Sequence, residues 1–253
     1  MHSYKTLLAG DILHLPLTRQ GIEAYATDRT AGVSPHLLGI SHSLQDILKP
    51  SINVVQVRRQ PPADIIGLAD LLRDVPSFKA QSTCTRQPDS VQQAVKQLLS
   101  YLPDHRLSQM LCADMQSIIH EFAYVSGFEA IDASLSVITS TSCPRFHADH
   151  VQLRCLCTYI GEGTYFVPNK AVNRHNWIRA LGICDTNGFG VKSATSVQQA
   201  TEWDVVILKG EAFPGNQGAG AVHKSPDASA ECPRLLLTLD EARQQCCDSY
   251  DNH

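Results

Sequence analysis

The residues best suited to chemistry in this sequence are two histidines, an aspartate and an arginine in its C-terminal half. His147 and Asp149 lie two positions apart in the segment Arg-Phe-His-Ala-Asp-His. Residues i and i+2 of an extended chain point to the same side, so these two side chains can converge on one metal ion. His223 follows much later, in Ala-Val-His-Lys-Ser-Pro, and Arg234 comes eleven residues after it.

Two histidines and one carboxylate that bind one face of a metal ion leave the opposite positions open. This arrangement suits non-haem Fe(II), to which a bidentate cosubstrate and O₂ must bind together. An arginine on a neighbouring strand can then hold the far carboxylate of a 2-oxo acid through paired hydrogen bonds. We therefore predict that His147, Asp149 and His223 are metal ligands. We predict Arg234 as the residue that binds the cosubstrate.

The order of these four residues resembles that of the Fe(II)/2-oxoglutarate dioxygenases. The segments Leu156 to Phe166 and Asp204 to Gly210, the latter followed by a Gly/Pro loop and His223, are similar to the prolyl-hydroxylase-like branch. Residues from about 45 to 240 resemble the bacterial domain-of-unknown-function family eighteen-twenty-six, in the blocks around His147 and His223. The dioxygenase resemblance implies a double-stranded β-helix, Fe(II) and 2-oxoglutarate as cofactors, and an unknown small-molecule or protein substrate.

Two features depart from the dioxygenase pattern, and two alternative functions stay open. The strand turn is Gly161-Glu162-Gly163 in place of Gly-Gly, and a polar insertion occupies Asn169 to Asn176. A solvated insertion is expected, with a substrate loop at Asn173 to Trp177 as the alternative. The same three ligands would suit Zn²⁺ with water as the fourth ligand, in a hydrolase or a metal-homeostasis protein. The other alternative is a non-catalytic scaffold with a vestigial site. Metal identity and consumption of 2-oxoglutarate distinguish these functions.

Residues near the predicted ligands are expected to have structural roles. His150 is out of phase with His147 and Asp149, so we expect it to face outward or to contact a ligand side chain rather than the metal. Arg154 and Tyr159 could face the pocket, but a surface charge for Arg154 and core packing for Tyr159 are the expected roles. Nine cysteines are present, none with the C-x-x-C spacing of a zinc ribbon, so reduced and mostly buried thiols are expected.

The elements that must position these residues change character along the chain. Helices are predicted after Pro61-Pro62, from about Asp89, and from about Asp104 to Gly127, because apolar residues recur there at helical spacing. Strands are predicted at Ile52 to Val57, Ser134 to Thr141, Gln152 to Ile160, Thr164 to Val167, Trp203 to Leu208 and Leu235 to Leu239. The predicted fold class is α+β, with N-terminal helices packed on a C-terminal double-stranded β-helix (jelly-roll) core.

The predicted organisation has three parts. An N-terminal extension covers 1–44, a single domain covers 45–240, and a polar tail covers 241–253. Within the domain, the helical part is about 62–127 and the β-barrel part is about 131–240.

Composition excludes several classes of protein. The chain has 253 residues, of which 43% are hydrophobic and 18% charged, a globular rather than a disordered composition. The net charge of −4 argues against nucleic-acid binding by bulk electrostatics. The charge-free stretches are too short and polar to span a membrane. Asp11 interrupts the first apolar run before a signal peptide can form, so a cytoplasmic location is expected.

Overall fold

The computed structural model describes residues 39–40, 43–61, 72, 75–102, 105–141, 143–174, 191 and 194–242. Apart from Leu72, the first predicted helix lies outside these residues, as do nearly all of the predicted extension 1–44 and tail 241–253. Within the described part of the chain, no helix is both long and apolar enough to cross a membrane.

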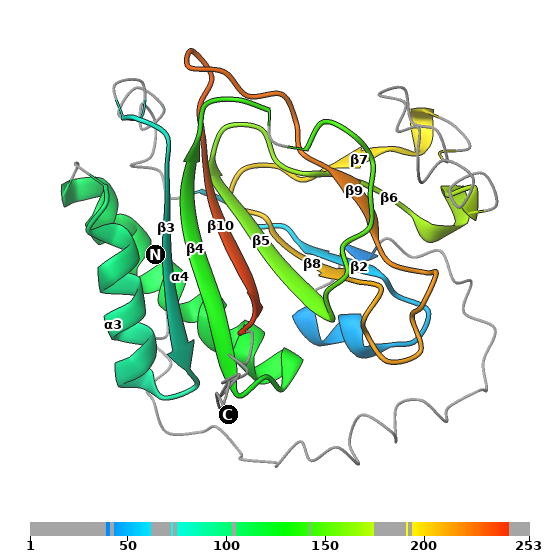
Figure 1. The fold of residues 1–253 in the computed structure, drawn as a ribbon, viewed down its shortest axis with the longest axis horizontal. Coiled ribbons are helices and arrows are strands. Elements are labelled where there is room, and N and C mark those ends of the chain that lie inside the picture. Colours follow the sequence, from blue (N-terminus) through cyan, green and yellow to red (C-terminus); the bar gives the residue numbers. More distant parts are fainter. Residues whose placement is uncertain are drawn as a thin grey trace, which may run out of the picture.

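Two sheets and two long helices make up the described structure (Figure 1). The strands are β1 Gly39–Ile40, β2 Val54–Val57, β3 Phe78–Thr85, β4 Ala130–Ile138, β5 Leu153–Ile160, β6 Tyr165–Val167, β7 Gln198–Gln199, β8 Val205–Lys209, β9 Val222–Lys224 and β10 Arg234–Glu241. The helices are α3 Pro88–Leu99 and α4 His105–Ser126, and short 3-10 turns lie at Leu44–Leu48, Asn169–Ala171 and Ala194–Ser196.

The strands form one large and one small sheet. The large sheet has seven strands in the order β1-β2-β8-β5-β10-β4-β3, and the small sheet has three in the order β7-β6-β9. Among the described strand pairs, only β1 and β2 run parallel. The fold is therefore a mostly antiparallel sheet structure with two helices.

Alternation along β5 gives the large sheet two different faces. One face joins the hydrophobic core that includes buried residues of α3 and α4, and its β5 members are Leu153, Cys155, Cys157 and Tyr159, as the sequence predicts. Leu156 points the other way and packs with Phe166 of β6. The small sheet therefore covers part of the face of the large sheet opposite to the helices, which Figure 1 shows with α3 and β6 on opposite sides.

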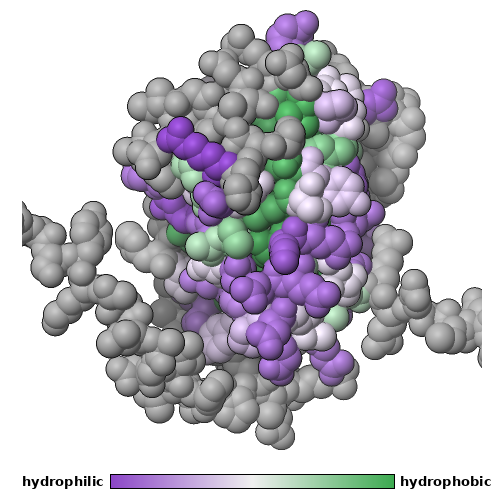
Figure 2. Space-filling view, turned by 90° about the vertical axis from the view of Figure 1, so that its left-hand side faces the viewer, coloured by the Kyte–Doolittle hydropathy of each residue, from purple (hydrophilic) through white to green (hydrophobic). Residues whose placement is uncertain are grey.

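The two helices begin and end close to their predicted positions. The buried face of α3 is Val91, Ala94, Val95, Leu98 and Leu99. Gly127 follows α4 with a φ of 74°, the left-handed conformation that glycine adopts most easily after a helix. Figure 2 faces the side of the molecule on which α3 lies, where hydrophilic residues surround a narrower hydrophobic strip.

One correction concerns the predicted helical part, 62–127. Residues 78–85 within it form β3, which pairs with β4 along its whole length. Ala80 and Cys84 are buried with polar residues between them, because β3 is an edge strand with one face toward the helices. This polar-rich alternation is a weaker strand signal than the valine- and isoleucine-rich runs further along.

The packing of α4 leads to a stability prediction. Leu111 is 0% exposed in the core between α4 and the large sheet. Leu111→Ala should lower the free energy of unfolding by about 2–5 kcal/mol, because it removes buried methyl groups and leaves a cavity. The measurement is urea unfolding. The control is Tyr124→Ala on the same helix, because Tyr124 is 47% exposed. It should change the free energy of unfolding by less than about 0.5 kcal/mol. Equal effects would contradict the packing described.

Candidate metal centre

The three predicted ligands come together beside the small sheet. His223 lies in β9, and His147 forms an isolated antiparallel bridge with it, with two backbone hydrogen bonds of 2.9 Å. The ring centroids of the two histidines are 4.4 Å apart. Potential ligand atoms of His147, Asp149 and His223 all lie within 4.8 Å of one another. This is the only such group of three or more found in the described part of the chain.

Both imidazole rings turn the same nitrogen toward Asp149. The His147 Nε2 is 3.3 Å from Asp149 Oδ1, and the His223 Nε2 is 3.2 Å from Asp149 Oδ2. The Nδ1 atoms lie 2.9 and 3.0 Å from the backbone carbonyls of Arg145 and Ala221. An Nδ1–H that donates to a carbonyl fixes the tautomer and leaves Nε2 free as a ligand. Two nitrogens and a carboxylate thus share one small volume, a donor set that fits a divalent metal ion such as Fe(II).

The electrostatics of the site favour an ionised carboxylate. Burial disfavours the charged form of Asp149, but hydrogen bonds with His147 and His223 and the positive charge of Arg154 outweigh it. Together they hold the pKa of Asp149 well below its usual range. The hydrogen bond with Asp149 also raises the pKa of His147. The aspartate is therefore present as the anion that a cation would need.

Arg154 is a functional candidate that the sequence interpretation ranked as a surface charge ahead of a pocket residue. It is not the expected surface charge, because its side chain is only 26% exposed. Its Nη1 donates to Asp149 Oδ2 at 2.5 Å, while Nε and Nη2 donate to the two carboxylate oxygens of Asp240 at 2.8 Å. The available signal was its position between Leu153 and Cys155, which places it on the face opposite to the helices. Arg154 orients the Asp149 carboxylate.

Arg234 lies at the start of β10 and is 1% exposed. Its Nε donates to the Glu162 carbonyl at 2.6 Å and its Nη2 to the Thr158 hydroxyl at 3.3 Å. Burial lowers the pKa of Arg234 to about 10, so its guanidinium stays protonated at neutral pH. No ion pair between Arg234 and a carboxylate is found in the described residues.

Arg234 faces the same side of the large sheet as the three ligands. Its partner Thr158 and the Asp149 partner Arg154 are four residues apart on β5, or ~13 Å at ~3.3 Å per residue. Leu156 lies between them and packs with Phe166. The arginine and the ligand group are therefore separated along one strand, with apolar side chains between them.

The remaining predicted positions have mixed outcomes. His150 is exposed, as its phase predicts. Tyr159 is buried on the helix side, where its hydroxyl donates to Asp114 at 2.8 Å. The insertion is less solvated than expected, because Arg174 is partly buried and donates to the Gly220 carbonyl at 2.7 Å. Residues 175–176 of the insertion lie outside the described residues.

A polar groove of about 920 Å³ opens beside Arg154. It runs over β3, β4 and β10, and its lining includes Arg154, Asp240, Thr238, Ser134 and Ser136. Hydroxyl groups therefore line much of the surface next to the residue that contacts Asp149.

The fold and the site define a two-sheet protein with a candidate His-Asp-His metal centre. The chain belongs to the family described as protein of unknown function (DUF1826), whose model matches residues 41–240. This match confirms the family that the sequence resembles. A search of curated proteins found no match.

Three solved structures that are similar to this chain are oxygenases by their descriptions. A rice dioxygenase for auxin oxidation has 12% identity and a TM-score of 0.40, over 77% of this chain and 74% of that one. A Pseudomonas putida prolyl-4-hydroxylase has 13% identity and a TM-score of 0.38, over 79% and 96%. A Burkholderia pseudomallei oxidoreductase of the 2OG-Fe(II) oxygenase family has 10% identity and a TM-score of 0.32, over 75% and 86%.

Proposed function

We propose that this chain is a non-haem Fe(II)- and 2-oxoglutarate-dependent oxygenase built on a double-stranded β-helix core. The proposed metal ligands are His147, Asp149 and His223. The observation that carries the proposal is that their potential ligand atoms lie within 4.8 Å of one another, with both Nε2 atoms turned to the carboxylate. Three protein ligands leave positions free for a bidentate cosubstrate and O₂.

Arg234 is the proposed partner of the far carboxylate of 2-oxoglutarate. Support comes from its burial without a carboxylate partner among the described residues, since a buried cation is normally paired. Its planar guanidinium can donate two parallel hydrogen bonds to a carboxylate. An extended dicarboxylate suits a site where one end meets a metal ion and the other a distant arginine.

The chain's own residues have defined roles in this proposal. Bound Fe(II) would supply O₂ activation coupled to oxidative decarboxylation of the 2-oxo acid. The carbonyls of Arg145 and Ala221 hold the imidazole rings, and Arg154 keeps the Asp149 carboxylate ionised and oriented. Leu156 and Phe166, which are buried in one cluster, would give the cosubstrate an apolar wall between the ligands and Arg234. The substrate is a small molecule or a protein.

The proposal is tested with the full-length chain purified without oxygen. Addition of Fe(II), ascorbate, O₂ and 2-oxoglutarate should release CO₂ and succinate in amounts that depend on Fe(II), even without the substrate. Metal analysis of the same preparation identifies the resident ion. Protein that holds zinc firmly, and neither binds nor decarboxylates 2-oxoglutarate, would contradict the proposal and favour the zinc alternative.

A further inference from the structure

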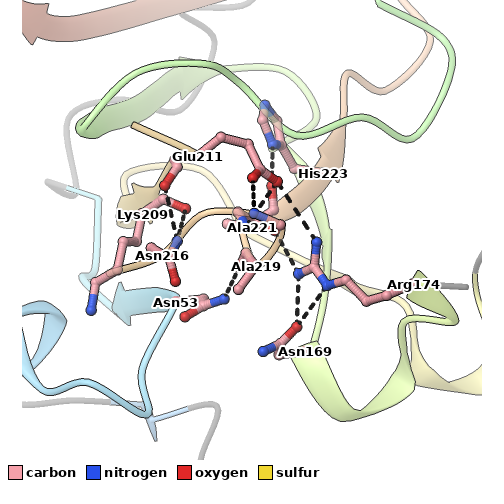
Figure 3. A network of polar contacts seen from close by, with 12 residues as sticks. Asn53, Asn169, Arg174, Lys209, Glu211, Asn216, Ala219, Ala221 and His223 are labelled. Atoms are coloured by element: carbon pink, nitrogen blue, oxygen red, sulfur yellow. Dashed lines mark hydrogen bonds and ion pairs between the residues drawn. The ribbon is translucent and has the colours of Figure 1, made fainter. Parts of the chain in front are cut away.

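The loop of residues 210–221 leads directly into His223 and is held by polar side chains (Figure 3). The buried side chain of Asn216 donates to the carbonyls of Lys209 and Gly210, at 3.4 and 2.9 Å. Asn53, from the residues just before β2, donates to the Ala219 carbonyl. Buried side chains therefore donate hydrogen bonds to backbone carbonyls in the loop and at its start. These bonds hold the backbone of the loop in one conformation.

The carboxylate of Glu211 holds the far end of the same loop. It accepts hydrogen bonds from the backbone N–H groups of Gly218 and Gly220, the latter at 3.0 Å. Arg174 donates to the Gly220 carbonyl at 2.7 Å, and its Nη1 lies 3.9 Å from the Glu211 Oε1. The backbone of Gly220 is thus held on its N–H side by Glu211 and on its carbonyl side by Arg174, as Figure 3 shows for these side chains.

The backbone of Glu211 is attached to the segment that carries Asp149. Its N–H donates to the Asp149 carbonyl at 2.9 Å, and the N–H of Ala212 donates to the Val151 carbonyl at 3.1 Å. A Cβ on Gly210 would lie 2.1 Å from the Val151 carbonyl oxygen, so the two segments are in close backbone contact. Glu211 therefore cannot move without disturbing the Asp149 segment.

Gly220 fits tightly between Glu211 and the segment that carries His147 and Asp149. A Cβ on Gly220 would lie 2.8 Å from the Glu211 Oε1 and 3.1 Å from the Cβ of Ala148. Ala148 lies between His147 and Asp149 in the sequence. The next residue, Ala221, supplies the carbonyl that orients the His223 ring. Gly220 thus helps to set where that carbonyl lies, together with the 2.8 Å hydrogen bond from the Ala221 N–H to the Lys209 carbonyl.

We propose that Glu211 is a positioning residue for the metal centre, in which its backbone anchors the Asp149 segment and its carboxylate anchors the loop that orients His223. The inference rests on the proposed metal-binding function. Glu211 touches none of the three ligand side chains in the contacts described, and it acts through Gly220 and Ala221. Loss of its carboxylate leaves two backbone N–H groups without their acceptor and removes the support on the Gly220 side of the carbonyl that holds the His223 ring.

The test uses Co(II) as the probe and the full-length chain. Co(II) affinity and coordination geometry are both read from the visible absorption of the bound ion. Glu211→Gln replaces one carboxylate oxygen by an amide group that cannot accept from a backbone N–H. It should weaken Co(II) binding by about 10-fold, the lower range for groups that orient metal ligands, and change the absorption bands. Glu211→Ala should have a larger effect on both.

The matched control is Glu202→Gln. The Glu202 carboxylate also accepts a backbone hydrogen bond, from Gly161 at 2.7 Å, but in a turn that carries no proposed metal ligand. This variant should bind Co(II) with the affinity and spectrum of the unaltered chain. A loss of affinity as large as that of Glu211→Gln would show that the effect is not specific to the loop.

Gly220→Ala tests the same contact from the other side. It should also weaken Co(II) binding by about 10-fold, with a smaller effect when Glu211 is already alanine, since one of the two colliding groups is then absent. This variant keeps Glu211, so it tests the contact even if the Glu211 variants fail to fold.

Glu211 variants with unaltered Co(II) affinity and spectrum would overturn the inference but not the metal site. An unaltered chain that binds no Co(II) would instead overturn the proposed function, and with it the inference.

Discussion

Arg234→Ala is expected to abolish 2-oxoglutarate turnover while leaving the metal ion bound. The substitution removes a buried cation whose proposed partner is the far carboxylate of the cosubstrate. Loss of such a desolvated, charge-assisted pair costs on the order of 2–5 kcal/mol. At ~1.4 kcal/mol per tenfold, this predicts a loss of cosubstrate affinity of about 30- to 4,000-fold. The measurements are 2-oxoglutarate affinity, Fe(II)-dependent CO₂ release and metal content.

Arg234→Lys distinguishes charge from geometry in the same experiment. Lysine keeps the positive charge but loses the planar pair of donors and the Nε donation to the Glu162 carbonyl. It should therefore weaken cosubstrate binding less than alanine does and spare the metal. Arg86→Lys is the matched control, because Arg86 also donates from Nε to a backbone carbonyl, that of Phe128. Normal decarboxylation by Arg234→Ala would remove this residue from the proposed site.

Asp149→Asn should have its largest effect on metal retention. The amide keeps the shape of the side chain but removes the anion, and Arg154 keeps both of its hydrogen bonds to Asp240. Groups that only orient a ligand contribute 10- to 100-fold to metal affinity, so loss of the anionic ligand itself should cost about 100-fold or more. The measurement is metal content after desalting, together with thermal unfolding of the metal-free protein.

A suitable control for this substitution is Asp227→Asn. The Asp227 carboxylate accepts from the Thr141 hydroxyl at 3.5 Å and belongs to no group of potential metal ligands found in the described residues. The control should retain the metal of the unaltered chain. If Asp149→Asn also retains it, the ion binds elsewhere and the proposed ligand set is wrong.

The proximity of His147 and Asp149 and the strands around them could be predicted because their signals are local. His147 and Asp149 are two residues apart. The apolar residues at every second position from Leu153 to Tyr159 indicate which face of β5 packs into the core. The pocket role of Arg154 was ranked second for a physical reason. A charged residue on an alternating strand indicates solvent, but here Asp149 and Asp240 pair with the guanidinium and leave the side chain 26% exposed. These partners lie 5 and 86 positions away, and the strand pattern of β5 does not indicate them.

Other features could not be predicted because they depend on contacts between distant segments. Arg174 and Gly220 are 46 positions apart, and nothing in the polar insertion indicates which carbonyl it contacts. The Gly-Glu-Gly turn was noted only as a departure from a pattern. In the structure, Gly161 has a φ of 85° with no room for a Cβ beside Pro233 and Arg234, and the Glu162 carbonyl accepts from Arg234. This turn therefore helps to position Arg234, the proposed cosubstrate residue.

If the proposed site holds a metal ion, the backbone bridge between His147 and His223 would link metal supply to the stability of the fold. The two ligands are joined by their own main chains, at 2.9 Å in both directions, so their spacing exists only while the chain is folded. An ion that binds this pair would bind the folded state and not the unfolded one. By mass action, free metal at one hundred times its dissociation constant would stabilise the protein by about 2.7 kcal/mol. The lifetime of the protein in a cell would then rise and fall with the free concentration of the ion it uses.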